Sequence, residues 1–181
     1  MPETTEADPG SHRDGFRALM SAFPSGVGVV TTTGRGGRPV GMTCSSLSSV
    51  TLNPPTLLVC LRSGSNTLAA VRESGAFAVN LLGREARSTA ELFASGAADR
   101  FSRVHWTLDR EAAGPHLDLD AHAVADCTLS RAVEVGDHMV VLGEVRRVSW
   151  DENPRPLLYG LRRYADWAAA TGEPAVPGSR R

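Results

Sequence analysis

Two long β-strand patterns near the carboxyl end constrain the fold of this chain of 181 residues more than any other feature. They cover residues 123–135 and 138–150, and only Gly136 and Asp137 separate them. A glycine–aspartate pair between two such runs is typical of a tight hairpin turn. We therefore expect two long antiparallel strands that are joined directly.

Shorter strand patterns fill much of the remaining sequence, with turn signals at residues 34–37 and 53–55. They are rich in β-branched or apolar residues and cover residues 27–33, 40–50, 56–61, 77–82 and 157–161. Helical patterns are short and cover residues 16–23, 65–75 and 84–94. Because many strands occur with only short helices, we expect a mainly β fold, an antiparallel barrel with short peripheral helices. No GxGxxG motif occurs, so a Rossmann nucleotide site is not expected.

One domain accounts for the length, since domains average roughly 150 residues. We expect it to span residues 13–168, between polar tails at residues 1–12 and 169–181 that are expected to be disordered. The amino terminus is acidic and polar, unlike a secretory signal peptide, and no apolar run approaches the roughly 20 residues of a membrane span. The three cysteines form no CxxC pair, which favours a reducing cytoplasm.

Lysine is absent from the sequence, so all 19 basic residues are arginine. A Schiff-base enzyme, a complete Walker A loop and the usual kinase lysine are thereby excluded. The formal net charge is −1 and the arginines are scattered, so a nucleic-acid partner is not expected. No G-x-S-x-G motif occurs, which leaves a serine hydrolase without its nucleophile.

Residues 43–49 carry five hydroxyl side chains, which is unusual for a core strand because each buried hydroxyl needs a hydrogen-bond partner. Two interpretations remain open: a solvent-facing edge strand, or a strand whose small side chains let a flat ligand lie against the backbone. Downstream, Arg62 and residues 65–67 supply a guanidinium, hydroxyls and a helix N-terminus. That segment is either an ordinary capped helix or an anion site.

Two single residues have both a functional and an ordinary structural interpretation. His138 directly follows the expected hairpin turn, and its position alone favours a surface residue. Cys44 is a possible nucleophile, but no base can be identified for it, so a small buried residue is favoured.

Four residues with metal-ligand chemistry lie close together in the sequence. His116, Asp118, Asp120 and His122 would share one face if their segment were extended. The glycine–proline pair that precedes them indicates a loop, and no further histidine stands at a suitable spacing. We therefore expect no metal site.

Taken together, these residues resemble the flavin reductase-like family, the NAD(P)H:flavin oxidoreductase components of two-component flavin-dependent monooxygenases. The resemblance runs from about residue 16 to residue 164. Its motifs are FPSGV at 23–27, VGMTCSSLSSV at 40–50, NPP at 53–55, SNT at 65–67, FAVNLL at 77–82, GDH at 136–138 and PLLY at 156–159. Each short motif is weak by itself, whereas the whole series in this order and spacing is specific.

The resemblance implies a Greek-key split β-barrel that forms a homodimer, with flavin near the subunit interface. It implies that four residues of the hydroxyl-rich segment hold the isoalloxazine ring and the ribityl chain: Met42, Thr43, Ser45 and Ser46. The flavin phosphate would be bound by three residues: Arg62, Asn66 and Thr67. His138 becomes the first-choice catalytic residue, beside the nicotinamide, and the pyridine nucleotide would also meet Arg162 and Tyr164.

The implied activity is hydride transfer from C4 of the nicotinamide of NADH or NADPH to N5 of a flavin. FMN is the preferred flavin and FAD the alternative, and the reduced flavin passes to a partner monooxygenase. Because the two cofactors carry the redox chemistry, the protein mainly positions their rings. Three other functions remain open: a non-catalytic flavin-binding or electron-carrier protein, a structural or partner-binding barrel, and a pyridoxamine-phosphate oxidase-like enzyme.

Overall fold

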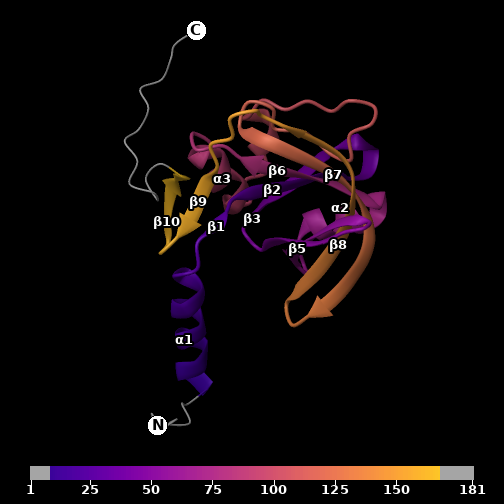
Figure 1. The fold of residues 1–181 in the computed structure, drawn as a ribbon. Coiled ribbons are helices and arrows are strands. Elements are labelled where there is room, and N and C mark those ends of the chain that lie inside the picture. The colour runs from indigo at the N-terminus through magenta and orange to yellow at the C-terminus, as the bar shows by residue number, and fades with distance from the viewer. Residues whose placement is uncertain (1–8, 168–181) are drawn as a thin grey trace.

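The computed structural model describes residues 9–167, so most of the two expected tails lies outside the described residues. This part of the chain forms a seven-stranded sheet, a three-stranded sheet and three α-helices (Figure 1). Helix α1 begins at Pro9, inside the expected amino-terminal tail. None of the described helices is long and apolar enough to span a membrane.

The large sheet is antiparallel throughout and has the strand order β3-β2-β6-β7-β8-β5-β4. Its strands are β2 (Gly28–Thr33), β3 (Pro39–Cys44), β4 (Leu47–Leu52), β5 (Pro55–Arg62), β6 (Ala76–Leu82), β7 (Ala121–Val135) and β8 (His138–Trp150). Strands β7 and β8 form the long hairpin that the sequence predicts, with Val135 opposite His138. The mainly β character and the strong hairpin are therefore both present.

The curvature of the large sheet follows from the short connection between its two edge strands. Strands β3 and β4 lie at opposite edges, yet only Ser45 and Ser46 separate them in the chain. The two edges must approach each other at this point, which is the geometry of a split barrel. Residues 40–50 therefore do not form the single strand expected from their composition. The chain leaves one edge at Cys44 and joins the other at Leu47.

A smaller sheet packs beside the barrel and consists of β1 (Ser25–Gly26), β9 (Leu157–Gly160) and β10 (Arg163–Asp166). The sequence predicts β9 but not β10. Leu161, expected at the end of β9, instead forms the turn with Arg162, and both residues have positive φ angles of 50° and 59°. Positive φ at both central positions is the conformation that a tight hairpin turn requires.

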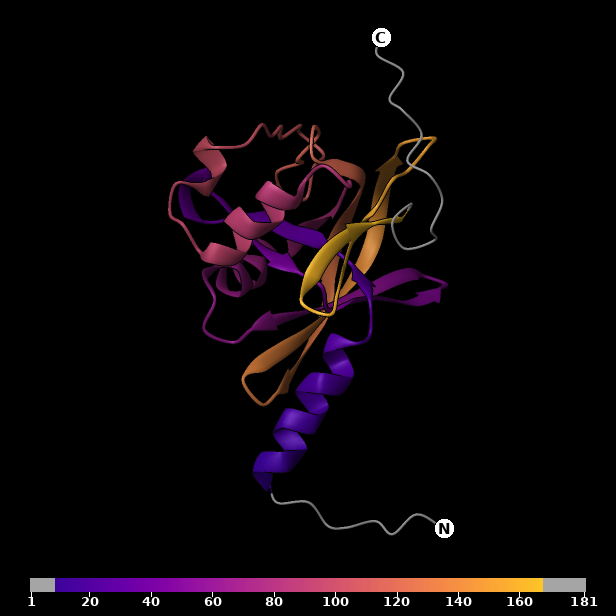
Figure 2. The ribbon, with the colours of Figure 1, turned by 90° about the vertical axis from the view of Figure 1, so that its left-hand side faces the viewer.

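The helices differ in how they contact the barrel. Helix α2 (Asn66–Ser74) has the expected caps, since Ser65 accepts a hydrogen bond from the Leu68 N–H and Gly75 ends the helix with a left-handed φ of 70°. Helix α3 (Arg87–Ser95) packs against β3. Figure 2 shows α1 (Pro9–Ser21) projecting away from the sheets, and its apolar residues are exposed.

The hydrophobic core has two parts. One lies inside the barrel and includes Leu61, Phe77 and Val141. The other lies under α3 and includes Phe93, Phe101 and Leu157. Gly143 is required beside the first part, because a Cβ at this position would lie only 2.4 Å from the Phe77 ring. The two parts fix the barrel and α3 relative to each other, and thereby the ends of β3 and β5.

Candidate functional site

Four of the expected site residues lie near the carboxyl end of β5: Ser45, Ser46, Arg62 and His138. Arg62 is the last residue of this strand, and it pairs in register with His138, the first residue of β8. The turn after β5 is tied to the GDH hairpin, since the Ser63 N–H donates to the Asp137 carbonyl at 3.0 Å. The strand pairing therefore brings together Arg62 and His138, which are far apart in the sequence.

His138 is held by its neighbour in the hairpin. Its Nδ1 lies 2.8 Å from Oδ1 of Asp137, and its side chain is 46% exposed. The hydrogen bond from His138 is the main cause that lowers the pKa of Asp137 below its usual range. A neutral imidazole that donates from Nδ1 keeps Nε2 free as an acceptor. The pair thus presents one defined ring nitrogen to a ligand.

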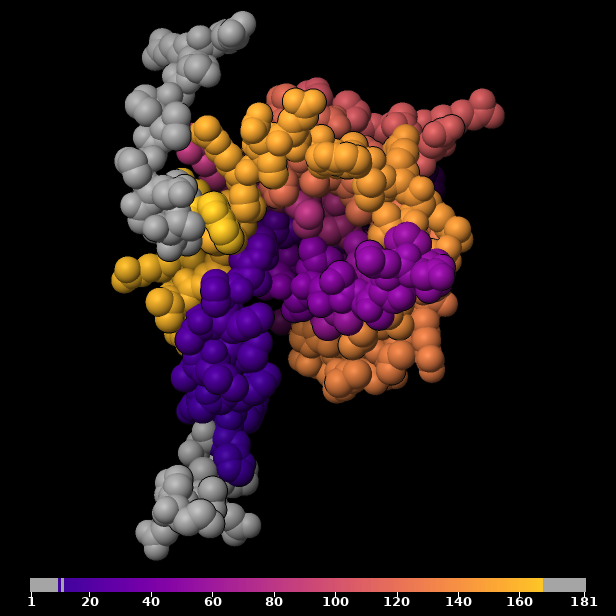
Figure 3. Space-filling model, viewed as in Figure 1, coloured from indigo at the N-terminus to yellow at the C-terminus, as the bar shows by residue number. Residues whose placement is uncertain are grey.

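A cavity of about 530 Å³ lies where the chain passes from β3 to β4. Its walls come from α1 and the segment after it, from β1, β4, β5 and β9, and from the link between β3 and β4: Phe16, Met20, Phe23, Ser25, Ser45, Ser46, Leu47, Ser48, Leu58 and Tyr159. Figure 3 shows α1 beside the segment that contains β4. We call this space the crossover cavity. It is mainly apolar, with hydroxyls on one side, which suits a flat heteroaromatic ring.

The crossover cavity and His138 both lie beside the carboxyl half of β5. The Cys60 N–H donates to the Ser46 carbonyl at 3.1 Å, and Arg62, two residues further on, is opposite His138. Two residues correspond to about 7 Å along a strand. The structure therefore brings Ser45, Ser46, Arg62 and His138 into one region.

Met42 and Thr43 point in opposite directions, as alternate residues of a strand must. Met42 packs against the core inside the barrel. The Thr43 hydroxyl donates to the Ala90 carbonyl of α3 at 2.6 Å. Its side chain thus contacts the helix, on the other face of β3 from Met42 and Cys44.

The amino-terminal end of α2 supplies the other two expected phosphate ligands. Asn66 is exposed, whereas Thr67 is 2% exposed. Asn66 also lines a cavity of about 400 Å³ that the sequence analysis did not anticipate. Its walls are Gly34, Arg35, Arg38, Pro39, Val40, Asn66, Ala98, Arg100 and Phe101, and we call it the arginine cavity. No local motif connects these residues, because they come from three separate segments.

The two residues expected near the pyridine nucleotide belong to the β9–β10 hairpin. Tyr164 lies beside Tyr159, with 5.1 Å between the ring centroids, and the Arg87 guanidinium lies 5.6 Å from the centre of the Tyr164 ring. Burial raises the pKa of Tyr164. Tyr159 also lines the crossover cavity, so Tyr164 is adjacent to this cavity through Tyr159. Arg162 is exposed in the turn.

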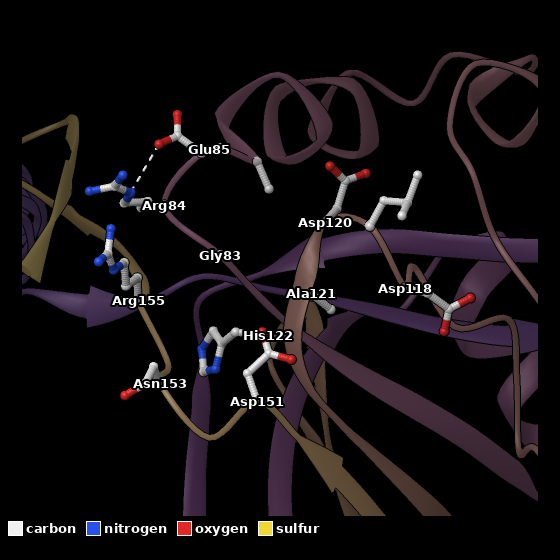
Figure 4. A pocket seen from close by; sticks show the side chains of 12 residues that line it. Gly83, Arg84, Glu85, Asp118, Asp120, Ala121, His122, Asp151, Asn153 and Arg155 are labelled. Carbon is white, nitrogen blue, oxygen red and sulfur yellow. Dashed lines mark ion pairs between the residues drawn. The ribbon is translucent and has the colours of Figure 1, made fainter. Parts of the chain in front are cut away.

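A third cavity, of about 260 Å³, lies at the other end of β7 and β8 from His138 (Figure 4). Arginine and aspartate side chains both line it, and His122 lies in its wall. Nδ1 of His122 is buried and makes no hydrogen bond with the described residues, and burial lowers the pKa of this histidine. This cavity carries both positive and negative side chains and lies far from the GDH hairpin. We therefore do not include it in the candidate site.

Three of the four residues considered as metal ligands have separate partners. His116 pairs with the buried Asp126 at 2.9 Å, Asp118 accepts from the Thr107 hydroxyl, and Asp120 accepts from the Thr89 hydroxyl. Within residues 9–167, no group of three or more histidine, cysteine or acidic side chains is arranged to hold a metal ion. All three cysteines are free thiols.

Comparison with known proteins defines the class to which this fold and site belong. The model of the flavin reductase like domain matches residues 20–168, and the chain belongs to this family. A flavin reductase (NADPH) from Lentzea aerocolonigenes is 51% identical over 167 residues, which cover 91% of this chain and 97% of that protein.

Two solved structures share the fold. The NADH:FAD oxidoreductase SgcE6 from Streptomyces globisporus C-1027, in complex with NAD and FAD fragments, has a TM-score of 0.80 and 32% identity, over 89% of this chain and 96% of that chain. The nitrilotriacetate monooxygenase component B homolog from Mycobacterium thermoresistibile has a TM-score of 0.82 and 31% identity, over 96% of this chain and 95% of that chain. These likenesses confirm the expected family and the mainly β split-barrel fold.

Proposed function

We propose that this protein is an NAD(P)H:flavin oxidoreductase that reduces a flavin, FMN or FAD, and supplies it to a partner monooxygenase. The observation that carries the proposal is the position of the GDH hairpin. It places His138 beside Arg62, and Arg62 lies two residues along β5 from Cys60, which is hydrogen-bonded to Ser46. Ser46 in turn lines a mainly apolar cavity. The family assignment and the relatives named as flavin reductases support the same activity.

The flavin would lie along the carboxyl end of β5. The crossover cavity would take the isoalloxazine ring, with Ser45 and Ser46 at its polar edge. The phosphate would lie toward the amino-terminal end of α2, near Asn66, with Arg62 as the nearby cation. Backbone N–H groups at a helix N-terminus favour an anion, which supports this direction for the ligand.

When bound, the flavin and the nicotinamide supply the redox chemistry, with hydride passing from nicotinamide C4 to flavin N5. The chain's own contribution is positioning. Asp137 orients the His138 ring, and His138 would hold the nicotinamide through its carboxamide. Tyr159 lines the crossover cavity and packs against Tyr164, so the two rings would cover one side of a bound ligand.

A homodimer is part of the proposal because α1 and the segment just after it expose an apolar face. Phe16, Leu19, Met20 and Phe23 are 46–67% exposed, and Phe16, Met20 and Phe23 line the crossover cavity. A second protomer that covers this face would bury apolar surface and close the cavity. We also propose that the protein acts in the cytoplasm, in keeping with its three free thiols.

Steady-state kinetics of the full chain test the activity. NADH or NADPH oxidation is measured with FMN, FAD or no added flavin, and we expect oxidation that depends on flavin. The His138→Ala variant should lose about tenfold in kcat/KM for the nucleotide, whereas His105→Ala, at an exposed histidine outside the site, should not.

Three results would contradict the proposal. If neither nucleotide were oxidised in a flavin-dependent way, the chain would not be a reductase. Tightly retained flavin without turnover would identify an electron carrier. The absence of a bound-flavin spectrum with excess FMN would leave a structural or partner-binding barrel.

A further inference from the structure

The end of the β7–β8 hairpin that lies away from His138 carries an exposed apolar surface that the proposed function does not use. Trp150, the last residue of β8, is 69% exposed, Val148 on the same strand is 51% exposed, and Leu119, just before β7, is 77% exposed. We call these three residues the Trp150 face. We propose that this face docks a partner protein by binding one of its arginine side chains. The inference does not depend on the proposed function, because His138 lies at the other end of the hairpin.

The exposure of the Trp150 face follows from the strand pairing. Trp150 and Val148 lie on one side of the sheet, because they are two residues apart in β8. They pair in register with Ala123 and Ala125 of β7, whose side chains are too small to cover them. A tryptophan exposed beside aliphatic side chains is typical of a protein–protein interface.

A small cavity of about 190 Å³ opens beside Trp150 and limits the size of what can bind there. Its walls are Asp118, Ala121, His122, Ala123, Val124, Ser149, Trp150 and Asp151, and we call it the Trp150 cavity. The volume lies below the usual range of small-molecule sites, roughly 300–1,000 Å³. The cavity therefore suits a single side chain rather than a flavin or a nucleotide, and side chains that fill such pockets anchor protein interfaces.

The charge of the Trp150 cavity favours a cation. Two carboxylates line it, Asp118 and Asp151, and no arginine does. The Asp118 carboxylate accepts from the neutral Thr107 hydroxyl, and within residues 9–167 neither aspartate forms an ion pair. Burial lowers the pKa of His122 in the same wall, so its ring is neutral at pH 7 and does not compensate the two negative charges.

The neighbouring third cavity, of about 260 Å³, does not reverse this charge, although two arginines line it. The Arg84 guanidinium is already paired with Glu85, with 2.9 Å between Nε and Oε1. Arg155 is the remaining cation of that cavity. Figure 4 shows both arginines on the opposite side of the His122 ring from the Asp151 carboxylate. The carboxylates beside Trp150 are thus left to attract a cation from outside the chain.

Arginine fits a pocket of two carboxylates and an indole ring better than other side chains do. Its planar guanidinium donates several hydrogen bonds to carboxylates and stacks on an aromatic face. The ammonium group of lysine is a compact point charge without a flat face. Arginine is also among the residues that contribute most to the binding energy of protein interfaces. The Trp150 face should therefore distinguish a guanidinium group from a neutral group of the same shape.

The first experiment measures the binding of one guanidinium group to the full chain, with N-acetyl-arginine amide as the probe. The indole N–H signals are followed by NMR, and the Trp150→Phe variant assigns the Trp150 signal among the three tryptophans. We expect this signal to shift with a dissociation constant on the order of 10 mM. N-acetyl-citrulline amide, which has nearly the same shape but no charge, should bind about tenfold more weakly.

Two variants test the role of the carboxylates. Asp118→Asn and Asp151→Asn should each weaken binding of the arginine probe by about threefold, as for one partly exposed charge. Both aspartates are exposed, so the variants should fold. Glu134→Gln is the matched control, since Glu134 is an exposed acid at the other end of the same hairpin, and it should bind the probe like the parent.

A second experiment tests whether a polypeptide docks through this group. A library of short displayed peptides is selected on the full chain, and peptides that also bind the Asp118→Asn, Asp151→Asn double variant are removed. We expect the remaining peptides to contain arginine, and replacement of that arginine by citrulline should weaken binding by about tenfold. Selected peptides without arginine would overturn the proposal.

Further outcomes would also overturn it. Equal binding of the arginine and citrulline probes would show that charge does not select the ligand, and unchanged binding in both aspartate variants would place the probe elsewhere. A change of oligomeric state in Trp150→Ala, seen by light scattering, would assign the face to a second copy of this chain. Flavin-dependent NADH or NADPH oxidation by Trp150→Ala should equal that of the parent, and a loss would assign the face to the flavin site. Absence of this oxidation in the parent contradicts the proposed function alone.

Discussion

The carboxylate of Asp137 lies 2.8 Å from Nδ1 of the adjacent His138, at the start of β8 and opposite Arg62 of β5. The hydrogen bond fixes which ring nitrogen His138 presents to a ligand, and it lowers the pKa of Asp137. Asp137 is therefore a positioning residue for the histidine.

The Asp137→Ala variant should lose the orientation of His138 without losing the flavin site. We expect kcat/KM for NADH or NADPH to fall about tenfold, as for a reacting group that is no longer oriented. The dissociation constant for flavin should not change, and Asp137→Asn should retain part of the activity because its amide oxygen still accepts from Nδ1. Stopped-flow reduction and flavin titration measure the two effects. An equal loss in both would contradict a positioning role.

Asp126 should contribute to acid lability of the fold. It is 3% exposed; burial alone would raise its pKa, but hydrogen bonds from His116, the Ala113 N–H and Arg147 outweigh burial and lower it. A lowered folded-state pKa stabilises the protein above the unfolded value of about 3.9, and this stability is lost as the pH falls through the lower folded value.

The Asp126→Asn variant tests this relationship. At pH 7 it should lower the free energy of unfolding by about 3 kcal/mol, because His116 and Arg147 lose a buried anionic partner. The difference from the parent should shrink as the pH falls below about 4. Urea denaturation at several pH values measures it, with the exposed Glu152→Gln as control. A difference that does not depend on pH would show that the lost carboxylate charge is not the cause.

Thr43 should support α3 through its side chain. Its hydroxyl donates to the Ala90 carbonyl at 2.6 Å, so Thr43→Val should cost about 1 kcal/mol of stability. Flavin affinity should stay within about twofold of the parent if the hydroxyl has no contact with the flavin. Thermal unfolding and flavin titration check both. A large loss of flavin affinity in a stable Thr43→Val variant would instead indicate that this hydroxyl contacts the flavin.

The exposed apolar face of α1 should hold the homodimer together. Leu19 is 67% exposed, and Leu19→Glu would place a charge in the proposed interface. We expect a monomer by light scattering, together with weaker flavin binding. Ala18→Glu is the matched control, since Ala18 is exposed on the opposite face of the same helix. A dimer that persists in Leu19→Glu would place the interface elsewhere.

Local sequence patterns predicted much of the secondary structure. The GDH turn between two β-rich runs predicted the β7–β8 hairpin, and Ser65 and Gly75 predicted both ends of α2. Such signals work because turn and cap preferences depend on a few adjacent residues. The break at Ser45 and Ser46 carried no comparable signal. It depends on which edge each half of the segment joins, and that is a long-range choice.

The sequence by itself determined the strand-rich composition of this protein, its hairpin and capped helix, and the order of motifs that indicates its family. Only the tertiary structure decided which of those residues meet. Strand register placed His138 beside Arg62, and the packing of Phe101 against Gly41 brought Arg100 to the cavity that also contains Arg38 and Asn66. The physical reason is that turns and caps follow from neighbouring residues, whereas a site assembled from distant segments depends on pairing and packing across the whole sheet.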